Sequence, residues 1–273
     1  MIDAHTHLQD PMIWESESWE NLQIRWKSAG VDGAVICGCW SGDWEDVRRL
    51  AEKSRNGEFS IYPQFGVHPW WVEKEKKNWE NNLKIFLHEY PIAGVGEIGL
   101  DSHFPGLAPM DKQIEFCEKQ LLIANEFQRP VTMHCLKAHN ELLAILKKHK
   151  LNNIKILMHM FTGSVEYVNA YCKFSPYIYF SVFSKGPKES LIEAIPIDRL
   201  VVETDSPFQP ALPKDIASMD ICCLPPQLRS GEKTINDPAQ LALSVQRIAK
   251  AKKISFDEAV KVTVENTKRA FNI

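Results

Sequence analysis

The sequence lacks the features that would place it in several specialised classes of protein. None of its apolar runs approaches the ~18 residues that a membrane-spanning helix needs, so we expect no membrane segment. Its seven cysteines include no CxxC pair, which argues against a disulfide scaffold and a structural zinc knuckle. The N-terminus carries charge and histidine where a signal peptide would be basic and then apolar. We therefore expect a cytoplasmic protein.

An excess of positive charge is also missing. Thirty-two lysines and arginines face 35 aspartates and glutamates, a formal net charge of −3. Proteins that bind nucleic acid over a broad surface usually carry a basic face, so any contact with a phosphodiester must here be local. The composition, 44% hydrophobic and 25% charged over 273 residues, fits a soluble globular chain. Residues 1–273 are long for one small domain and fit a single barrel domain.

Short apolar runs recur along the chain at fairly even intervals, with helical patterns between them. The runs cover residues 1–7, 31–37, 60–67, 93–100, 130–135, 155–161, 177–183 and 200–204. The clearest helical patterns cover residues 44–53, 110–127 and 139–148. Eight strands that alternate with helices predict an α/β fold, a TIM-type (β/α)8 barrel with its active site at the C-terminal ends of the strands.

The chain after the eighth run changes character. Residues 206–238 are rich in proline and have no period, which predicts a long loop over one end of the barrel. Two helices are expected to close the chain, over residues 238–251 and 255–270. Ser255 and Glu258 form a capping box at the start of the last one.

Histidines and carboxylates gather at the ends of five of the predicted strands. His5 and His7 stand two residues apart on the first strand and should face the same way, into the mouth of the barrel. Glu97 lies in an apolar GEIGLD segment, where a carboxylate is costly unless it is paired or bound to a metal. The remaining candidates end later strands: His134, His159 and Asp205.

These six side chains exceed the needs of one tetrahedral metal site. A bridging carboxylate would let them hold two divalent ions a few ångströms apart. Two such ions and two carboxylates leave a charge of about +2, which favours an anionic substrate such as a phosphodiester. Histidine ligands favour Zn²⁺ or Mn²⁺ over Mg²⁺, and the identity of the ion stays open.

Other residues of interest allow two interpretations. His68, in FGVHPWW, either contacts a substrate oxygen or is a loop histidine. Trp70 and Trp71 either stack on a base or cover the barrel against a neighbouring loop. Cys135 follows His134 but should point to the other side of its strand, so we expect it to pack and not to react.

Six motifs together resemble those of a known family. HTH, GVHP, GEIGLD, MHC, HMFTGS and ETDSPF occur in the order and spacing of the TatD family of metal-dependent hydrolases, barrel proteins of the amidohydrolase superfamily. The resemblance covers the whole chain and implies a deoxyribonuclease that uses divalent metal. It implies one ion held by His5, His7, Glu97 and Asp205, and a second, bridged by Glu97, held by His134 and His159. It also implies that His68 contacts the scissile phosphate.

The departures from the family pattern lie where substrate would be bound. Trp70 stands where the family usually has a second histidine, and Ser102 where it commonly has tyrosine. Lys137 replaces a more frequent arginine, and Arg229 and Lys233 are only loosely similar to a basic RGK segment. His68, Lys137, Arg229 and Lys233 are therefore the candidate substrate-binding residues, with the metal ligands unaffected.

Three functions remain in competition. The first is a nuclease that removes nucleotides from DNA ends, with Asp205 orienting or deprotonating a metal-activated water, Glu97 bridging the ions and His68 contacting the phosphate. The second is a hydrolase of a small amide, ester or lactone. The third is a binding module without turnover, against which the complete ligand set argues. No membrane and no obligate protein partner is expected.

Overall fold

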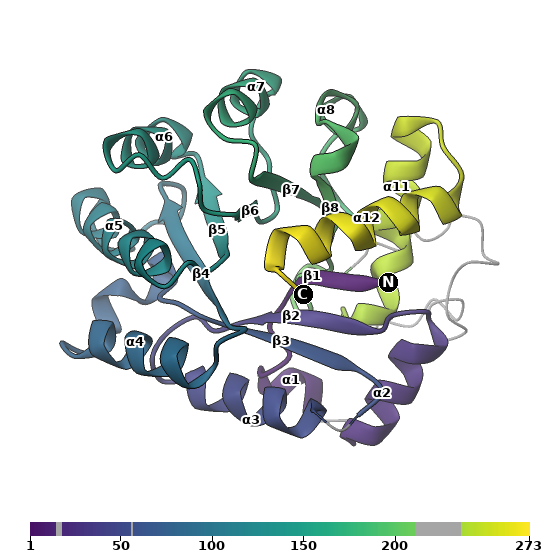
Figure 1. The fold of residues 1–273 in the computed structure, drawn as a ribbon, viewed down its shortest axis with the longest axis horizontal. Helices are drawn as coiled ribbons and strands as arrows, with labels where there is room; N and C mark the ends of the chain where they lie inside the picture. The colour runs from purple at the N-terminus through teal and green to yellow at the C-terminus, as the bar shows by residue number, and fades with distance from the viewer. Residues whose placement is uncertain (15–17, 56, 211–235) are drawn as a thin grey trace.

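The computed structural model describes residues 1–14, 18–55, 57–210 and 236–273, and it contains the predicted barrel (Figure 1). Eight parallel strands pair in chain order from β1 to β8. Their bounds are β1 Ile2–Thr6, β2 Gly33–Cys37, β3 Ser60–Phe65, β4 Gly94–Asp101, β5 Val131–Leu136, β6 Ile156–Met158, β7 Ile178–Val182 and β8 Leu200–Val202. Backbone bonds from Asp205 N to His5 O (3.1 Å) and from His7 N to Ser206 O (2.7 Å) join the last strand to the first.

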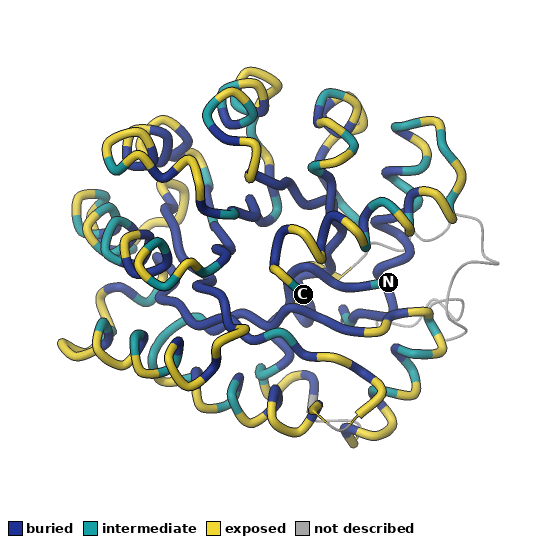
Figure 2. Tube along the Cα trace, viewed as in Figure 1, coloured by how far each residue is buried: buried dark blue, intermediate teal, exposed yellow. Residues whose placement is uncertain are grey.

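Helices surround the strands on the outside, and the last helix, α12, crosses one end of the barrel, as Figure 1 shows. They are α1 Pro11–Trp14, α2 Trp19–Ser28, α3 Trp44–Ser54, α4 Trp79–Glu89, α5 Met110–Glu126, α6 His139–Lys148, α7 Val165–Phe174, α8 Glu189–Ala194, α11 Leu241–Lys252 and α12 Phe256–Phe271. Short 3-10 turns are η1 Pro69–Lys74, η2 Ile197–Arg199 and η4 Pro238–Gln240. In Figure 2 the strands are almost wholly buried while the outer helix faces are exposed, the pattern of a parallel sheet covered by helices.

The predicted elements agree closely with the observed ones, and the differences have local causes. The helix expected over residues 139–148 has those bounds, and Ser255 accepts a hydrogen bond from Glu258 N (3.1 Å) at the start of α12. The sixth and eighth strands end earlier than predicted, at Met158 and Val202. Met160 (φ 40°) and Asp205 (φ 62°) soon follow, and a positive φ is incompatible with an extended strand.

The N-terminal end of the barrel is closed by apolar packing under α12. Asn266 Nδ2 donates to the oxygen of Leu200, the first residue of β8 (2.7 Å), so this helix lies against the beginnings of the strands. Phe271, only 3% exposed, joins the buried strand residues Ala4, Val35, Cys37, Leu157, Tyr179 and Val201. The opposite, C-terminal end is thereby the one open to ligands. No helix within the described ranges is long and apolar enough to cross a membrane.

Candidate metal centre

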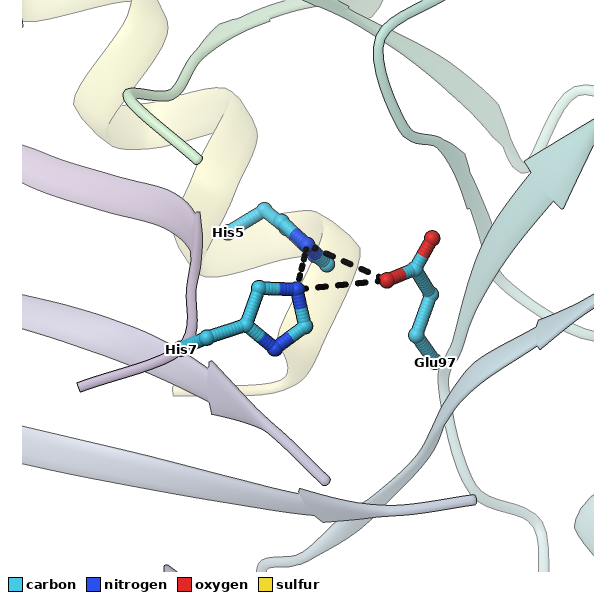
Figure 3. Close-up of side chains that lie close together, drawn as sticks. All are labelled: His5, His7 and Glu97. Carbon is cyan, nitrogen blue, oxygen red and sulfur yellow. Dashed lines mark hydrogen bonds and ion pairs between the residues drawn. The ribbon is translucent and has the colours of Figure 1, made fainter. Parts of the chain in front are cut away.

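His5 and His7 converge on one carboxylate oxygen at the C-terminal end of β1. Their Nε2 atoms lie 3.1 Å apart, and each faces Oε2 of Glu97, at 3.4 Å and 3.3 Å (Figure 3). The pairing of β1 with β2 shifts register between Asp3 and Thr6, around His5. Such a bulge can redirect a side chain, and it explains why Ala4 joins the inner apolar cluster although His5 follows it directly.

The hydrogen-bond partner of His7 fixes which ring nitrogen carries its proton. His7 Nδ1 lies 2.8 Å from the carbonyl oxygen of Cys37, which can only accept, so Nδ1 is the donor. The lone pair then remains on Nε2, the atom that faces Glu97. This is the usual support of a metal-binding histidine, whose second nitrogen is held by a backbone carbonyl or a carboxylate.

Glu97 lies on β4, across the barrel from β1, and its two oxygens face different groups of histidines. Oε2 faces β1, whereas Oε1 lies 3.1 Å from His134 Nδ1, 3.5 Å from His68 Nε2 and 3.8 Å from His159 Nε2. Burial raises the pKa of this carboxyl, but the surrounding imidazoles outweigh it and hold the pKa well below its usual range. Glu97 has no arginine partner among the contacts described. Its partners are histidines.

Asp205 completes the cluster from the segment after β8. Its Oδ1 lies 3.5 Å from His5 Nε2, 3.6 Å from His7 Nε2 and 3.9 Å from His159 Nε2. A φ of 62° is uncommon outside glycine, and the bond from Asp205 N to His5 O helps to hold it. His5 and His159 also stack, with their ring centroids 3.7 Å apart.

The donor atoms fit a divalent metal. Within the described residues, three sets each bring their ligand atoms within 4.8 Å of one another: His5, His7 and Glu97; His5, His159 and Asp205; and His68, Glu97 and His134. Imidazole nitrogens and carboxylate oxygens are ligands for Zn²⁺ and Mn²⁺, and carboxylates for Mg²⁺. Glu97 belongs to two of these sets, as a bridging ligand would.

Two further carboxylates belong to this site and escaped the sequence prediction. Asp101 Oδ2 lies 3.1 Å from His134 Nε2, and Glu203 Oε1 lies 3.1 Å from His159 Nδ1. In each histidine one ring nitrogen faces Glu97 and the other faces the additional carboxylate. A carboxylate in that second position commonly orients a metal-binding histidine. Both residues are buried, at 1% and 0% exposure. Like Glu97, each is an acidic residue at the end of an apolar strand run, the signal that could have found them.

These two carboxylates change the expected charge of the site. The sequence sum of +2 counted two divalent ions against Glu97 and Asp205 alone. With Asp101 and Glu203 the acidic groups number four, so two divalent ions would be balanced and the sum becomes zero. The predicted charge of about +2 thus left out two carboxylates that contact the histidines of the site, and with them the attraction of an anion depends on individual contacts.

The remaining predicted residues lie around this cluster. His68 is 7% exposed, and its Nδ1 accepts a hydrogen bond from Trp70 N (3.2 Å). Lys137 is exposed, and its Nζ lies 2.9 Å from His103 Nδ1. Cys135 faces away from the cluster, with its sulfur 3.3 Å from His139 Nδ1. Arg229 and Lys233 lie outside the described residues.

The two neighbouring tryptophans have different surroundings. Trp71 stacks on Trp40, with ring centroids 4.9 Å apart and an interplanar angle of 11°, so it packs one loop against another. Trp70 is 44% exposed, and its indole Nε1 donates to Asp101 Oδ2 over 2.9 Å. Trp70 thus contacts the carboxylate that holds His134.

Comparison with known proteins agrees with this geometry. The family model described as TatD related DNase matches residues 2–272. The chain belongs to the TatD family. It is 31% identical to the uncharacterised metal-dependent hydrolase YabD of Bacillus subtilis, over 100% of this chain and 99% of the relative. It is 27% identical to the 3'-5' ssDNA/RNA exonuclease TatD of Edwardsiella piscicida, over the full length of both.

A solved structure shares the barrel of this TatD-family chain. The TatD homologue YjjV of Escherichia coli superposes with a TM-score of 0.84, covering 100% of this chain and 98% of the other at 24% identity. At that identity the likeness establishes the fold. The resemblance inferred from the six motifs and the predicted barrel are both confirmed.

Proposed function

We propose that this chain is a divalent-metal-dependent nuclease that hydrolyses phosphodiester bonds and removes nucleotides from the ends of DNA strands. The observation that carries the proposal is Glu97, whose two oxygens face separate groups of imidazoles in a family described as TatD related DNase. Relatives named as an exonuclease on single-stranded DNA and RNA and as a deoxyribonuclease support the substrate class.

We assign two ions to the cluster, one held by His5, His7, Glu97 and Asp205, the other by Glu97, His134 and His159. Bound divalent ions supply a nucleophilic water at neutral pH and neutralise charge that develops on the phosphate. Glu97 holds the two groups of ligands in register. Asp101 orients His134 through a hydrogen bond of 3.1 Å, and Glu203, 3.1 Å from His159 Nδ1, is placed to orient His159 when that ring holds an ion.

Asp205 is the group that takes the proton of the attacking water. Burial raises the pKa of this carboxyl, but His5 and His159 lower it by more than burial raises it. The net pKa therefore lies below its usual value. Asp205 is therefore ionised at neutral pH and accepts the proton as the water attacks phosphorus. The bond from phosphorus to the leaving oxygen then breaks, and that oxygen is protonated from solvent.

His68 is assigned to the substrate and not to the metal because of its tautomer. Its Nδ1 accepts from Trp70 N, so the proton of the neutral ring lies on Nε2, the atom that faces the cluster. Burial lowers the pKa of His68 to about 4, which keeps the ring neutral at pH 7. A protonated Nε2 cannot ligate metal but can donate a hydrogen bond to a phosphate oxygen. Lys137, exposed nearby on the segment after β5, is a second candidate phosphate contact.

The test is hydrolysis of single-stranded DNA labelled at either end, with Mg²⁺, Mn²⁺ or Zn²⁺ added to metal-free protein. A panel of amides, esters and lactones is assayed beside it under the same conditions. We expect mononucleotides to be released from one end and the panel to stay intact. Turnover of an amide or lactone with intact DNA would contradict the proposal and favour the small-molecule hydrolase.

A further inference from the structure

An aromatic groove lies beside the metal centre, and the mechanism above uses none of its side chains, only the backbone N–H of Trp70 that fixes the tautomer of His68. A cavity of about 250 Å³ is lined by Trp70, Trp71, Lys74, Phe104, Pro105 and Leu107. Trp70 and Phe104 are large aromatic side chains that remain 44% and 47% exposed. Their rings meet edge to face, with centroids 4.6 Å apart and an interplanar angle of 66°.

The groove is directly connected to the ligands of the cluster. The Trp70 ring lies 5.3 Å from the His68 ring, measured between centroids, at an angle of 85°. Its indole N–H is held by Asp101, which also contacts His134. Trp70 is thus fixed at its polar edge while much of the ring is left to solvent. A fixed aromatic ring loses little conformational entropy when a ligand stacks on it.

The lining of the groove favours one class of occupant. It contains aromatic and apolar side chains and one lysine, and no carboxylate is among them. Lys74 Nζ lies over the Trp71 ring, 4.6 Å from its centroid, so a positive charge borders the aromatic surface. Flat aromatic ligands attached to an anionic backbone match this combination. Those are the properties of an unpaired nucleotide in a single strand.

We propose that Trp70 and Phe104 form a stacking subsite for one unpaired nucleobase of a single-stranded nucleic acid. The strand's scissile phosphate then lies at the metal centre, a placement that rests on the function proposed above. Lys74 contacts the backbone of the same strand. Since a base in a duplex already stacks on its neighbours, the subsite selects single strands or frayed ends. Every base has a π-face, so the subsite tolerates all four.

Phe104→Ala is the informative variant, because Phe104 contacts Asp101 only through its backbone N–H (3.3 Å), which the substitution keeps. The Trp70 indole itself donates to Asp101, so its removal would also disturb the support of His134. Steady-state cleavage is measured on single-stranded oligonucleotides of one length, each with an abasic residue at a different position. On the intact strand we expect Phe104→Ala to raise KM about tenfold, in the range of one base–aromatic stack, with little change in kcat. Phe104→Tyr keeps a ring and should behave as the wild type.

The abasic series identifies the stacked base. At one position, removal of the base should raise the KM of the wild type about as much as Phe104→Ala does. The KM of Phe104→Ala should not rise further on that abasic strand, because the stack is already lost. Ile92→Ala is the matched control, since Ile92 is 61% exposed and lies two residues before β4, at the other end of the barrel. Equal KM for wild type and Phe104→Ala on the intact strand would overturn the subsite, as would losses that add at every position.

Failure of the nuclease proposal gives a different result. If the wild type leaves every strand intact with all three ions, the nuclease assignment fails. The same series is then measured as affinity for fluorescently labelled strands by anisotropy. A tenfold weaker affinity of Phe104→Ala, lost at one abasic position, still supports the subsite. Equal affinities of wild type and variant at all positions would overturn it.

Discussion

The two ends of the barrel are built from the same eight strands, yet they differ in what they bury. The N-terminal end buries an apolar cluster around Phe271. The C-terminal end buries polar groups instead: three histidines of the cluster, His68 and four carboxylates are each at most 7% exposed. The fourth histidine of the cluster, His134, is half-buried. Buried charges of this kind stabilise a fold weakly, because desolvation offsets their attraction. The polar end is therefore arranged for chemistry, and the apolar end stabilises the fold.

Backbone conformation shows the same division. Four of the described non-glycine residues with positive φ, Gln128, Lys150, Lys253 and Asn272, lie just beyond helix ends, where a left-handed residue commonly terminates a helix. Lys137, Met160 and Asp205 instead follow β5, β6 and β8 at the metal centre. Such conformations cost free energy for residues other than glycine and gather at functional sites. Substitutions at the two ends should accordingly affect different properties.

Glu97→Ala should produce the largest loss of activity. Removal of the carboxylate takes a ligand from both proposed ions and leaves their mutual repulsion unscreened, so we expect turnover to fall about a thousandfold. The barrel should remain folded, because the lost group contacts histidines and not the apolar cluster. Turnover with each metal and the thermal unfolding midpoint are measured together. Retention of more than a tenth of the wild-type turnover would contradict the two-ion assignment.

Phe271→Ala should have the opposite effect. Truncation of this buried ring should lower the free energy of unfolding by about 3–5 kcal/mol, because it removes apolar contacts and leaves a cavity. Turnover measured well below the unfolding midpoint should stay within twofold of the wild type. Denaturant unfolding gives the first quantity, and Phe271→Leu, which keeps most of the volume, is the control. A clear fall in kcat without loss of stability would show that the two ends are coupled.

His68→Ala should lower turnover about a hundredfold while metal content stays unchanged. The reason is the tautomer, which gives Nε2 a proton to donate to the substrate and no lone pair for an ion. Metal content of the purified variant is measured by elemental analysis, beside kcat and KM. A loss of about one ion per chain would make His68 a metal ligand and contradict its assignment to the substrate.

Glu203→Gln tests the outer part of the polar end. The amide retains the shape of Glu203 but weakens its hold on His159 Nδ1, 3.1 Å away. Replacement of such a supporting carboxylate typically costs 10–100-fold in metal affinity or activity, and we expect a loss in this range. Titration of metal-free protein measures it. Asp101→Asn should give a similar loss at His134, whereas Glu189→Gln, in an exposed pair with Lys250, should give none.

The sequence predicts the site better than it predicts the surroundings of the site. His5, His7, Glu97, His134, His159 and Asp205 converge as expected, because a parallel barrel brings the ends of its strands together. The prediction missed Asp101 and Glu203, although each is an acidic residue at the end of an apolar run. That pattern marks the residue but does not show which histidine its carboxylate contacts. The register shift around His5 could not be predicted either, because it depends on pairing with the next strand.

The aromatic loop shows a second limit of sequence patterns. Trp70 and Trp71 are adjacent and chemically identical, yet one is exposed and the other stacks on Trp40. A 3-10 turn has no apolar period from which to predict which side chain faces the protein. Only the tertiary contacts of each ring, to Asp101 and to Trp40, distinguish them.

The smallest expected effect concerns a buried histidine at the polar end that holds no ion. His139 is 6% exposed among Phe161, Tyr167 and Tyr171, and burial lowers its pKa to about 4. In the unfolded chain the pKa returns to about 6.5, so the unfolded state binds a proton that the folded state excludes between pH 6.5 and 4. Stability from this group is fully present above pH 6.5 and is lost as the pH falls.

We therefore expect His139 to remove about 2 kcal/mol of stability between pH 7 and pH 5, by the linkage between proton binding and folding. His139→Phe should lack this part of the pH dependence. Between pH 7 and pH 8 the His139 ring is largely neutral in the folded and the unfolded state, so the stabilities of variant and wild type should change by the same amount. Denaturant unfolding at pH 5, 7 and 8 measures the difference between the two slopes. All other residues are the same in the two proteins, so their contributions cancel in that difference. Identical slopes from pH 7 to pH 5 would mean that the acid sensitivity of the polar end comes from the metal centre and not from His139.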